Sequence, residues 1–246
     1  MSSDDTNVSA LPSTSQPVIY LTGDSLTQQG TDPEKSGWVA LMQHRYNRSA
    51  DIIPRGLSGY NTKWFIDSAL PVIERELSGE VRPPSLITLW LGANDAALPD
   101  GNAARQHVPL AAYKENLVTI VHTFQTRAPE ARILLITPPH VDDAVRKSRS
   151  PSGCAERTDA AAGEYARACV EVARDLGMNV LDLYSFFHML PEKDRAACLD
   201  DGLHFTAMGN RLVDEQLQTK ISKVFPDLGK QLEAWQLPDF RVWIDA

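Results

Sequence analysis

The sequence predicts an α/β protein built on a mainly parallel sheet. Short apolar runs alternate along the chain with segments of helical periodicity, which is the pattern of repeated βα units. Two of these runs are continuously apolar, as expected of strands that helices cover on both faces. At 246 residues, the chain has a length that suits one large domain with a sizeable core.

The patterns predict each element in turn. Strands are predicted at residues 18–22, 51–54, 86–91, 133–137 and 179–183, and the third and fourth are the continuous apolar runs. Helices with apolar positions three and four apart are predicted at 36–47, 62–77, 111–127 and 158–176, with a final helix over 206–224. The stretch 184–203 is expected to be irregular, and residues 138–158 form a long connection after the fourth strand.

These elements place one domain at residues 18–224. Residues 1–17 are acidic and rich in Ser and Thr, without the basic start and apolar stretch of a secretory signal, so we expect a flexible segment. Residues 225–246 form a tail that we expect to dock on the domain or on a second subunit. The aromatic residues toward its end are Trp235, Phe240 and Trp243.

The composition excludes several classes of protein. A net charge of −8 without a basic stripe argues against a nucleic-acid partner, because phosphate binding depends on clustered Lys and Arg. No apolar run approaches the roughly 18 residues of a membrane helix, so no membrane insertion is expected. The three cysteines lie at irregular spacings that fit neither a disulfide framework nor a zinc site. We therefore expect a cytoplasmic protein.

The candidate functional residues follow the predicted strands, because ligands of open α/β sheets bind beyond the carboxyl ends of the strands. Ser25 follows the first strand in "GDSL", Gly59 follows the second in "RGLSGYNT", and Asn94 follows the third in "GAND". Asp201 and His204 stand in "DGLH", just before the final helix.

This set supplies what acyl transfer to water through a serine requires. Ser25 is the candidate nucleophile, His204 is the base that takes its proton, and Asp201 is the carboxylate that orients the imidazole. A spacing of three residues places carboxylate and imidazole on the same side of one turn. The candidate donors to an oxyanion are the backbone N–H groups of Ser25 and Gly59 and the side-chain amide of Asn94.

Each of these residues also has an ordinary interpretation when it is taken alone. Ser25 is suited to capping a helix, Gly59 to a loop and Asn94 to a turn. Their joint order along the chain favours the catalytic interpretation. The neighbouring Asp24 is expected to be a turn or cap residue, because a residue adjacent to the serine on a tight turn points away from it.

The motifs together resemble the SGNH (GDSL) hydrolase family. Gly-Asp-Ser-Leu, the second glycine of Arg-Gly-x-x-Gly, Gly-x-Asn-Asp and Asp-x-x-His occur here in that order. The resemblance implies a flavodoxin-like three-layer α/β/α fold with a five-stranded, mainly parallel sheet. It also implies esterase or lipase chemistry without a metal or a cofactor. The roles it assigns fall on Ser25, Gly59, Asn94, Asp201 and His204.

Longer stretches resemble the isoamyl acetate-hydrolysing esterases within that family. They include "GDSLTQ", "RGLSGYNT", "QHVPLAAYKENL" and "DGLHFTAMGN", and the similarity extends over residues 18–212. The resemblance implies hydrolysis of short-chain esters of alcohols, a small-molecule ester as the binding partner, and a homodimer. The loop 141–157 and the tail depart from it, and we expect both to border the acyl and alcohol pockets.

The sequence leaves the acyl group open. Lysophospholipases, thioesterases and carbohydrate deacetylases use the same catalytic machinery on other substrates. A protein that kept the fold without an activated serine would instead be a carbohydrate- or protein-binding module. Pocket volume depends on tertiary contacts that periodicity does not specify.

Overall fold

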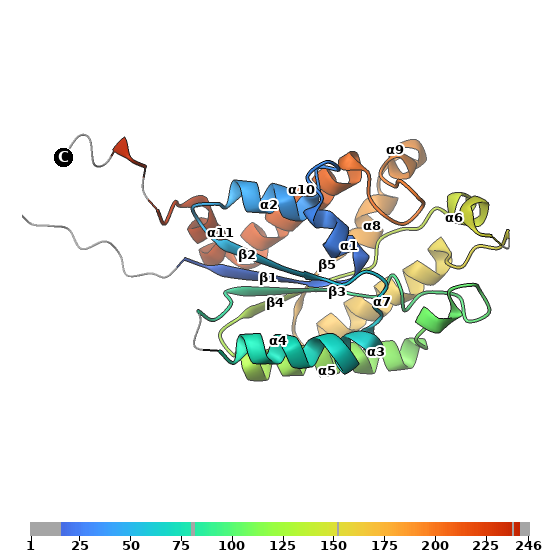
Figure 1. The fold of residues 1–246 in the computed structure, drawn as a ribbon, viewed down its shortest axis with the longest axis horizontal. Helices are drawn as coiled ribbons and strands as arrows, with labels where there is room; N and C mark the ends of the chain where they lie inside the picture. Colours follow the sequence, from blue (N-terminus) through green and yellow to red (C-terminus); the bar gives the residue numbers. More distant parts are fainter. Residues whose placement is uncertain (1–15, 80–81, 152, 238, 242–246) are drawn as a thin grey trace, which may run out of the picture.

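A five-stranded parallel sheet forms the centre of the molecule (Figure 1). The computed structural model describes residues 16–79, 82–151, 153–237 and 239–241. The strands are β1 Val18–Gly23, β2 Asp51–Gly56, β3 Leu86–Trp90, β4 Arg132–Ile136 and β5 Asn179–Leu181. Neighbouring strands are parallel throughout, in the order β2-β1-β3-β4-β5. The predicted parallel sheet is confirmed, and its strand order is that of a flavodoxin-like fold.

Helices cover both faces of the sheet and complete three layers (Figure 1). One outer layer contains α2 Trp38–Arg45, α10 Ala207–Val224 and α11 Pro226–Glu233, and the other contains α4 Leu70–Leu77, α5 Leu110–Arg127 and α7 Asp159–Asp175. The side chains of β1 alternate between the two cores. Ile19 and Leu21 pack in the first, and Val18 and Tyr20 in the second. A strand with two covered faces has to be apolar on both, which explains the continuous apolar runs.

The helices predicted at 36–47, 111–127, 158–176 and 206–224 are confirmed as α2, α5, α7 and α10. The helix predicted at 62–77 is continuous but changes its geometry along its length. It consists of α3 Thr62–Trp64, the π-helical η2 Phe65–Ala69 and then α4. Two 3₁₀ turns, η1 Gln29–Thr31 and η3 Ala104–Gln106, lie outside the prediction. No helix in the described ranges has both the length and the hydropathy of a membrane span.

Two expectations about irregular structure were wrong. Residues 184–203 contain most of α8 Leu183–His188 and all of α9 Glu192–Ala197, and the connection 138–158 contains α6 Asp143–Arg149. These helices have six or seven residues, which is less than two turns of an α-helix. They are therefore too short to show a clear apolar period. Asp182 caps α8 through the backbone N–H of Ser185, which also explains why β5 ends at Leu181 and not at residue 183.

The tail continues the helical layer beyond residue 224. In α11, Leu228 and Leu232 are buried in the same core as β1. The Trp235 ring lies 4.5 Å from the guanidinium carbon of Arg48, whereas the Phe240 side chain is exposed. Trp243 and most of the segment 1–17 lie outside the described residues. Docking of the tail on a second subunit stays a prediction.

The topology places the carboxyl ends of β1, β2 and β3 side by side at the same end of the sheet. β1 pairs with β2 on one side and with β3 on the other. The connection after β1 therefore runs to one side of the sheet and the connection after β3 to the other, which leaves a crevice at the carboxyl ends of these two strands. The short helix α1 Ser25–Gln28 starts there and packs against the end of β2. Gly56 permits this contact, because a Cβ atom at that position would lie 2.1 Å from the backbone nitrogen of Gln28. The first glycine of Arg-Gly-x-x-Gly therefore sets the position of α1.

We expect Gly56→Ala to lower the free energy of unfolding by about 1–3 kcal/mol, the usual cost of overpacking. The added methyl has to displace α1, so it should also move Ser25 and slow the ester hydrolysis expected from the sequence. Urea denaturation and an ester assay measure the two effects. Gly229→Ala in α11 is the comparison variant, with a smaller expected loss, since a Cβ atom there would lie 3.1 Å from the Cα atom of Ser222, a tight contact that a small shift relieves. Equal stability of the two variants would contradict the close packing of α1 on β2.

Candidate active site

Ser25 is the first residue of α1, and only Asp24 separates it from the end of β1. The strand is buried between two neighbours, so the position of its carboxyl end, and hence of Ser25, is fixed by the sheet. The Asp24 carboxylate caps α1 by accepting a hydrogen bond of 2.9 Å from the backbone N–H of Leu26. The predicted role of Asp24 as a cap is thus confirmed. Ser25 itself does not cap the helix but lies inside its first turn.

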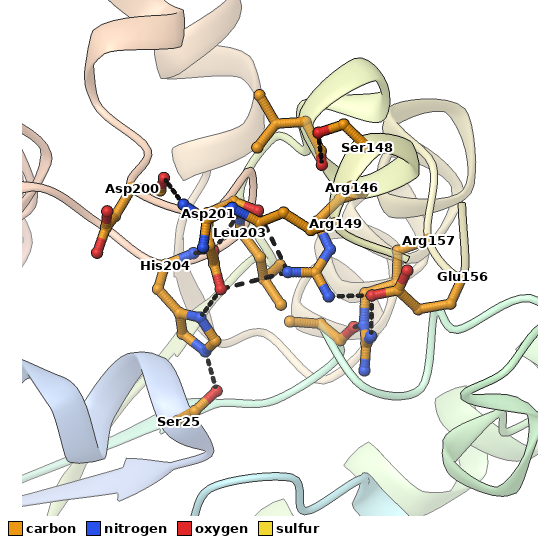
Figure 2. A network of polar contacts seen from close by, with 12 residues as sticks. Ser25, Arg146, Ser148, Arg149, Glu156, Arg157, Asp200, Asp201, Leu203 and His204 are labelled. Atoms are coloured by element: carbon orange, nitrogen blue, oxygen red, sulfur yellow. Dashed lines mark hydrogen bonds and ion pairs between the residues drawn. The ribbon is translucent and has the colours of Figure 1, made fainter. Parts of the chain in front are cut away.

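The side chains of Ser25, His204 and Asp201 form one continuous series of hydrogen bonds (Figure 2). His204 Nε2 lies 2.9 Å from Ser25 Oγ, and His204 Nδ1 lies 2.8 Å from Asp201 Oδ2. With the Nδ1 proton donated to the carboxylate, Nε2 is left as the acceptor for the serine hydroxyl. The arrangement has the geometry that general-base activation of a serine requires.

A turn, and not a helix, brings the Asp201 carboxylate and the His204 imidazole together. Asp201 Oδ1 accepts hydrogen bonds from the backbone N–H groups of Leu203 at 2.9 Å and His204 at 2.8 Å. An antiparallel bridge between Leu199 and Phe205 closes the base of this turn. The carboxylate therefore holds the backbone with one oxygen and the imidazole with the other.

The surroundings of Asp201 keep its carboxylate ionised. Partial burial by itself raises the pKa of Asp201, but hydrogen bonds from the side chain and backbone of His204 outweigh it, and the pKa lies well below its usual value. Arg146 Nη1 lies 3.3 Å from Asp201 Oδ2, the same oxygen that faces the imidazole, and adds a positive charge beside the carboxylate (Figure 2). A negative charge is thus available to stabilise an imidazolium at His204.

The surroundings of Asp24 have the opposite effect and favour its protonated carboxyl group. Complete burial is the largest influence and raises the pKa of Asp24 to about 7, although the hydrogen bond from Leu26 acts to lower it. Its second carboxylate oxygen, Oδ2, is buried without a hydrogen-bond partner in the described structure. Asp24 is accordingly protonated in mildly acidic solution, while Asp201 is ionised.

Three candidate hydrogen-bond donors belong to residues that line the same cavity as the serine hydroxyl. As the first residue of α1, Ser25 has a backbone N–H with no acceptor inside the helix. Gly59 has a φ of +82°, a conformation that glycine adopts without strain. The buried Asn94 donates one Nδ2 hydrogen to the carbonyl of Tyr60 at 2.9 Å, which leaves the second hydrogen for a ligand.

One cavity of about 230 Å³ joins these groups. All five residues predicted for the site, Ser25, Gly59, Asn94, Asp201 and His204, line it. Leu203 is the one lining residue with an apolar side chain among the described residues, and the other lining side chains are polar or charged. The cavity lies at the carboxyl edge of the sheet, where the topology predicts ligand binding.

Sequence reasoning missed five polar residues of this cavity: Gln29, Ser58, Gln106, Arg146 and Arg157. Two of them belong to the loop 141–157, so that loop borders the site as expected, whereas no described residue of the tail lines the cavity. Arg146 lies on α6 and Arg157 immediately before the cap of α7. Nothing in the sequence distinguishes them from the exposed Arg149, because no periodicity applies to this loop. Within the described ranges, no group of three or more His, Cys, Asp or Glu residues is placed to hold a metal ion.

Comparison with known families matches residues 21–212 to the GDSL-like lipase/acylhydrolase family. The chain belongs to this family. It is a carboxylic ester hydrolase. A GDSL esterase/lipase of Arabidopsis thaliana is 39% identical to this GDSL hydrolase over 212 residues, which cover 83% of this chain and 86% of the relative. An isoamyl acetate-hydrolyzing esterase 1 homolog of Rattus norvegicus is 38% identical and covers 89% of this chain and 87% of the relative.

Solved structures of similar fold include hydrolases of the same kind. A lipase/acylhydrolase from Enterococcus faecalis superposes with a TM-score of 0.63 at 25% identity, over 85% of this chain and 96% of the other. An acetyl xylan esterase superposes with a TM-score of 0.67 at 17% identity, over 83% of this chain and 99% of the other. The second likeness concerns the fold alone. Both agree with the three-layer α/β/α architecture of the GDSL hydrolase.

We expect Asp24→Asn to flatten the dependence of stability on pH between about 4 and 7. In wild type, the folded protein keeps the Asp24 proton in this range and the unfolded chain releases it, because the pKa is raised to about 7 on folding. Stability contributed by this group therefore falls as pH rises, by about 1.4 kcal/mol per unit of pKa difference. Asp201, whose pKa is lowered, acts in the opposite direction and at lower pH.

Urea denaturation at pH 4.5 and pH 8, chosen on either side of the raised pKa, measures this effect. The exposed Asp67, which is ion-paired with Lys63, provides the control substitution Asp67→Asn. An unchanged pH slope in Asp24→Asn would show that Asp24 is ionised in the fold.

Proposed function

We propose that this GDSL hydrolase cleaves short-chain carboxylic esters of alcohols, acetates included, through an acyl-enzyme on Ser25. The observation that supports this most directly is the hydrogen-bonded series from Asp201 through His204 to Ser25, with distances of 2.8 and 2.9 Å. It ends in a cavity that also contains Gly59 and Asn94.

In the first half-reaction, Ser25 Oγ attacks the ester carbonyl while its proton moves to His204 Nε2. The Asp201 carboxylate stabilises the imidazolium that results. The carbonyl oxygen becomes an oxyanion, and the N–H groups of Ser25 and Gly59 and the amide of Asn94 are the donors toward it. Collapse of this intermediate breaks the bond to the alcohol oxygen, and the alcohol leaves with the proton from His204.

In the second half-reaction, water replaces the alcohol. His204 accepts a proton from the water as its oxygen attacks the acyl carbon, and the same donors stabilise the second oxyanion. The bond to Ser25 Oγ then breaks, the acid is released, and the proton returns from His204 to Ser25. The atoms balance with ester and water alone, so the proposal includes no cofactor and no metal.

A small acyl group is supported by the dimensions of the site and by the relatives. The cavity has a volume of about 230 Å³, and Leu203 is the single apolar side chain among its described lining residues. Several relatives are named isoamyl acetate-hydrolyzing esterase 1 homologs, at 37–38% identity. A lysophospholipase would need an extended apolar channel for its acyl chain. Thioesters and acetylated carbohydrates remain alternative substrates for the same machinery.

We retain a cytoplasmic homodimer as part of the proposal. Among the described residues, Cys169 and Cys198 are buried free thiols, which suits a reducing compartment. Trp235, Leu237 and Phe240 expose more than half of their surface near the end of the described chain, which suits contact with a second subunit. Sedimentation of the full chain tests the dimer, and a monomer at all concentrations would exclude it.

We expect Ser25→Ala to abolish hydrolysis of p-nitrophenyl acetate while leaving the fold intact. The loss in turnover should be about 10⁴-fold or more, because the other groups do not replace the nucleophile. A fluorophosphonate should label wild type and fail to label the variant. Labelling also separates an enzyme from a binding module of the same fold, which lacks an activated serine. Wild-type turnover in Ser25→Ala would defeat the assignment.

We expect kcat/KM to fall along a series of p-nitrophenyl esters from acetate through butyrate to octanoate. A chain of eight carbons finds few apolar side chains among the described residues of this cavity, so it gains little from its extra length. The corresponding acetyl thioester and an acetylated xylose test the two alternative substrate classes. Highest activity on octanoate would contradict the small-ester proposal and favour a lipase.

A further inference from the structure

Arg157 is a buried arginine beside the catalytic cavity, with 5% of its surface exposed. Its Nε atom donates to the carbonyl of Ala93 at 2.9 Å, and Nη2 donates to Asn94 Oδ1 at 2.9 Å. Arg157 comes from the connection after β4, whereas Ala93 and Asn94 follow β3. The guanidinium thus joins two separate segments at the candidate oxyanion donor.

The contact with Asn94 determines which way its amide faces. A guanidinium has N–H groups only and accepts no hydrogen bond, so the atom that faces Arg157 has to be the amide oxygen. The amide NH₂ group then points to the carbonyl of Tyr60, at 2.9 Å, and into the cavity. A flipped amide would place its NH₂ group against the guanidinium and its oxygen against the oxyanion. Arg157 and the carbonyl of Tyr60 therefore together select the orientation in which Asn94 donates.

A second hydrogen bond from the same guanidinium nitrogen connects Arg157, through Gln106, to the segment of Gly59. Arg157 Nη2 donates to Gln106 Oε1 at 2.5 Å, and Gln106 Nε2 donates to the carbonyl of Gly59 at 2.9 Å. The side-chain amide of Gln106 is oriented by the same rule, because its oxygen has to face Arg157. Gly59 has a positive φ, and glycine has more backbone freedom than other residues. The hydrogen bond from Gln106 to its carbonyl restricts that freedom.

The charge of Arg157 is balanced within the same loop. Glu156 accepts from Arg157 Nη1 at 3.4 Å and also pairs with Arg146, which in turn lies 3.3 Å from Asp201 (Figure 2). Each nitrogen of the Arg157 guanidinium thus has a protein partner. We conclude that the guanidinium nitrogens of Arg157 are engaged in hydrogen bonds within the protein. Arg157 therefore acts through its neighbours instead of binding substrate directly.

We propose that Arg157 is a positioning residue for the oxyanion hole, which orients Asn94 directly and Gly59 through Gln106. The inference rests on the proposed function and extends it to a residue outside the family motifs. It assigns a role to the end of the loop 141–157, which lies outside the motifs that predicted the site. Loss of Arg157 should then slow the chemical step more than it weakens substrate binding.

A double-mutant cycle on the full chain tests this role, with p-nitrophenyl acetate as substrate. Arg157→Met should lower kcat by about 10- to 100-fold and change KM by less than about threefold, because donors to an oxyanion act in the transition state. Asn94→Ala should cost about 100-fold or more. In the Asn94→Ala background, Arg157→Met should cost a markedly smaller factor, since only the connection to Gly59 remains to be lost.

Arg167→Met, at an exposed position on α7, is the matched control and should retain the wild-type kcat. Arg157→Lys keeps the charge but not the forked geometry, and we expect a lower kcat here as well. If circular dichroism shows that Arg157→Met does not fold, the same cycle with Arg157→Lys decides the question.

Equal factors for the Arg157 substitution in both backgrounds, or a wild-type kcat in Arg157→Met, would overturn the inference. These outcomes are distinct from failure of the proposed function. In that case Ser25→Ala would keep its activity or wild type would show none. If Ser25→Ala is inactive and Arg157→Met is unimpaired, only the role of Arg157 is wrong.

Discussion

The burial of β1 between two strands and two helical layers is the constraint on which the rest of the structure depends. Ile19 and Leu21 are fully buried on one face, and Val18 and Tyr20 pack in the core on the other. A strand held on four sides has no freedom of register, because a shift of one residue would exchange its two faces. The carboxyl end of β1, and with it Ser25, is therefore placed by the hydrophobic core.

The local environments then shift the pKa values of Asp24 and Asp201, two carboxyl groups beside the serine, in opposite directions. Asp24 is fully buried, and its pKa is raised to about 7, whereas hydrogen bonds lower the pKa of Asp201 despite its partial burial. Environments that drive such pKa values apart give two chemically similar groups different tasks. Asp24 serves α1 as a cap, and Asp201 faces the imidazole of His204 with a full negative charge.

The connection after β4 adds polar support that the motif segments lack. It contributes Arg146 beside Asp201 and Arg157 beside Asn94, with Glu156 between the two guanidinium groups. Asn94 and Asp201, on two sides of the cavity, are thus joined through one short stretch of chain. Such a network has to be satisfied throughout, because an unpaired charge at this depth is costly.

The sequence by itself determined the five strands, the long helices and the residues Ser25, Gly59, Asn94, Asp201 and His204, because apolar periodicity and short motifs are local properties. It did not reveal α6, α8 and α9, which are too short to show a period. Only the tertiary structure decided that Arg157, and not the exposed Arg149, reaches Asn94. That contact joins positions 63 residues apart in the chain. It exists because the sheet brings the ends of β3 and β4 together, which no local pattern encodes.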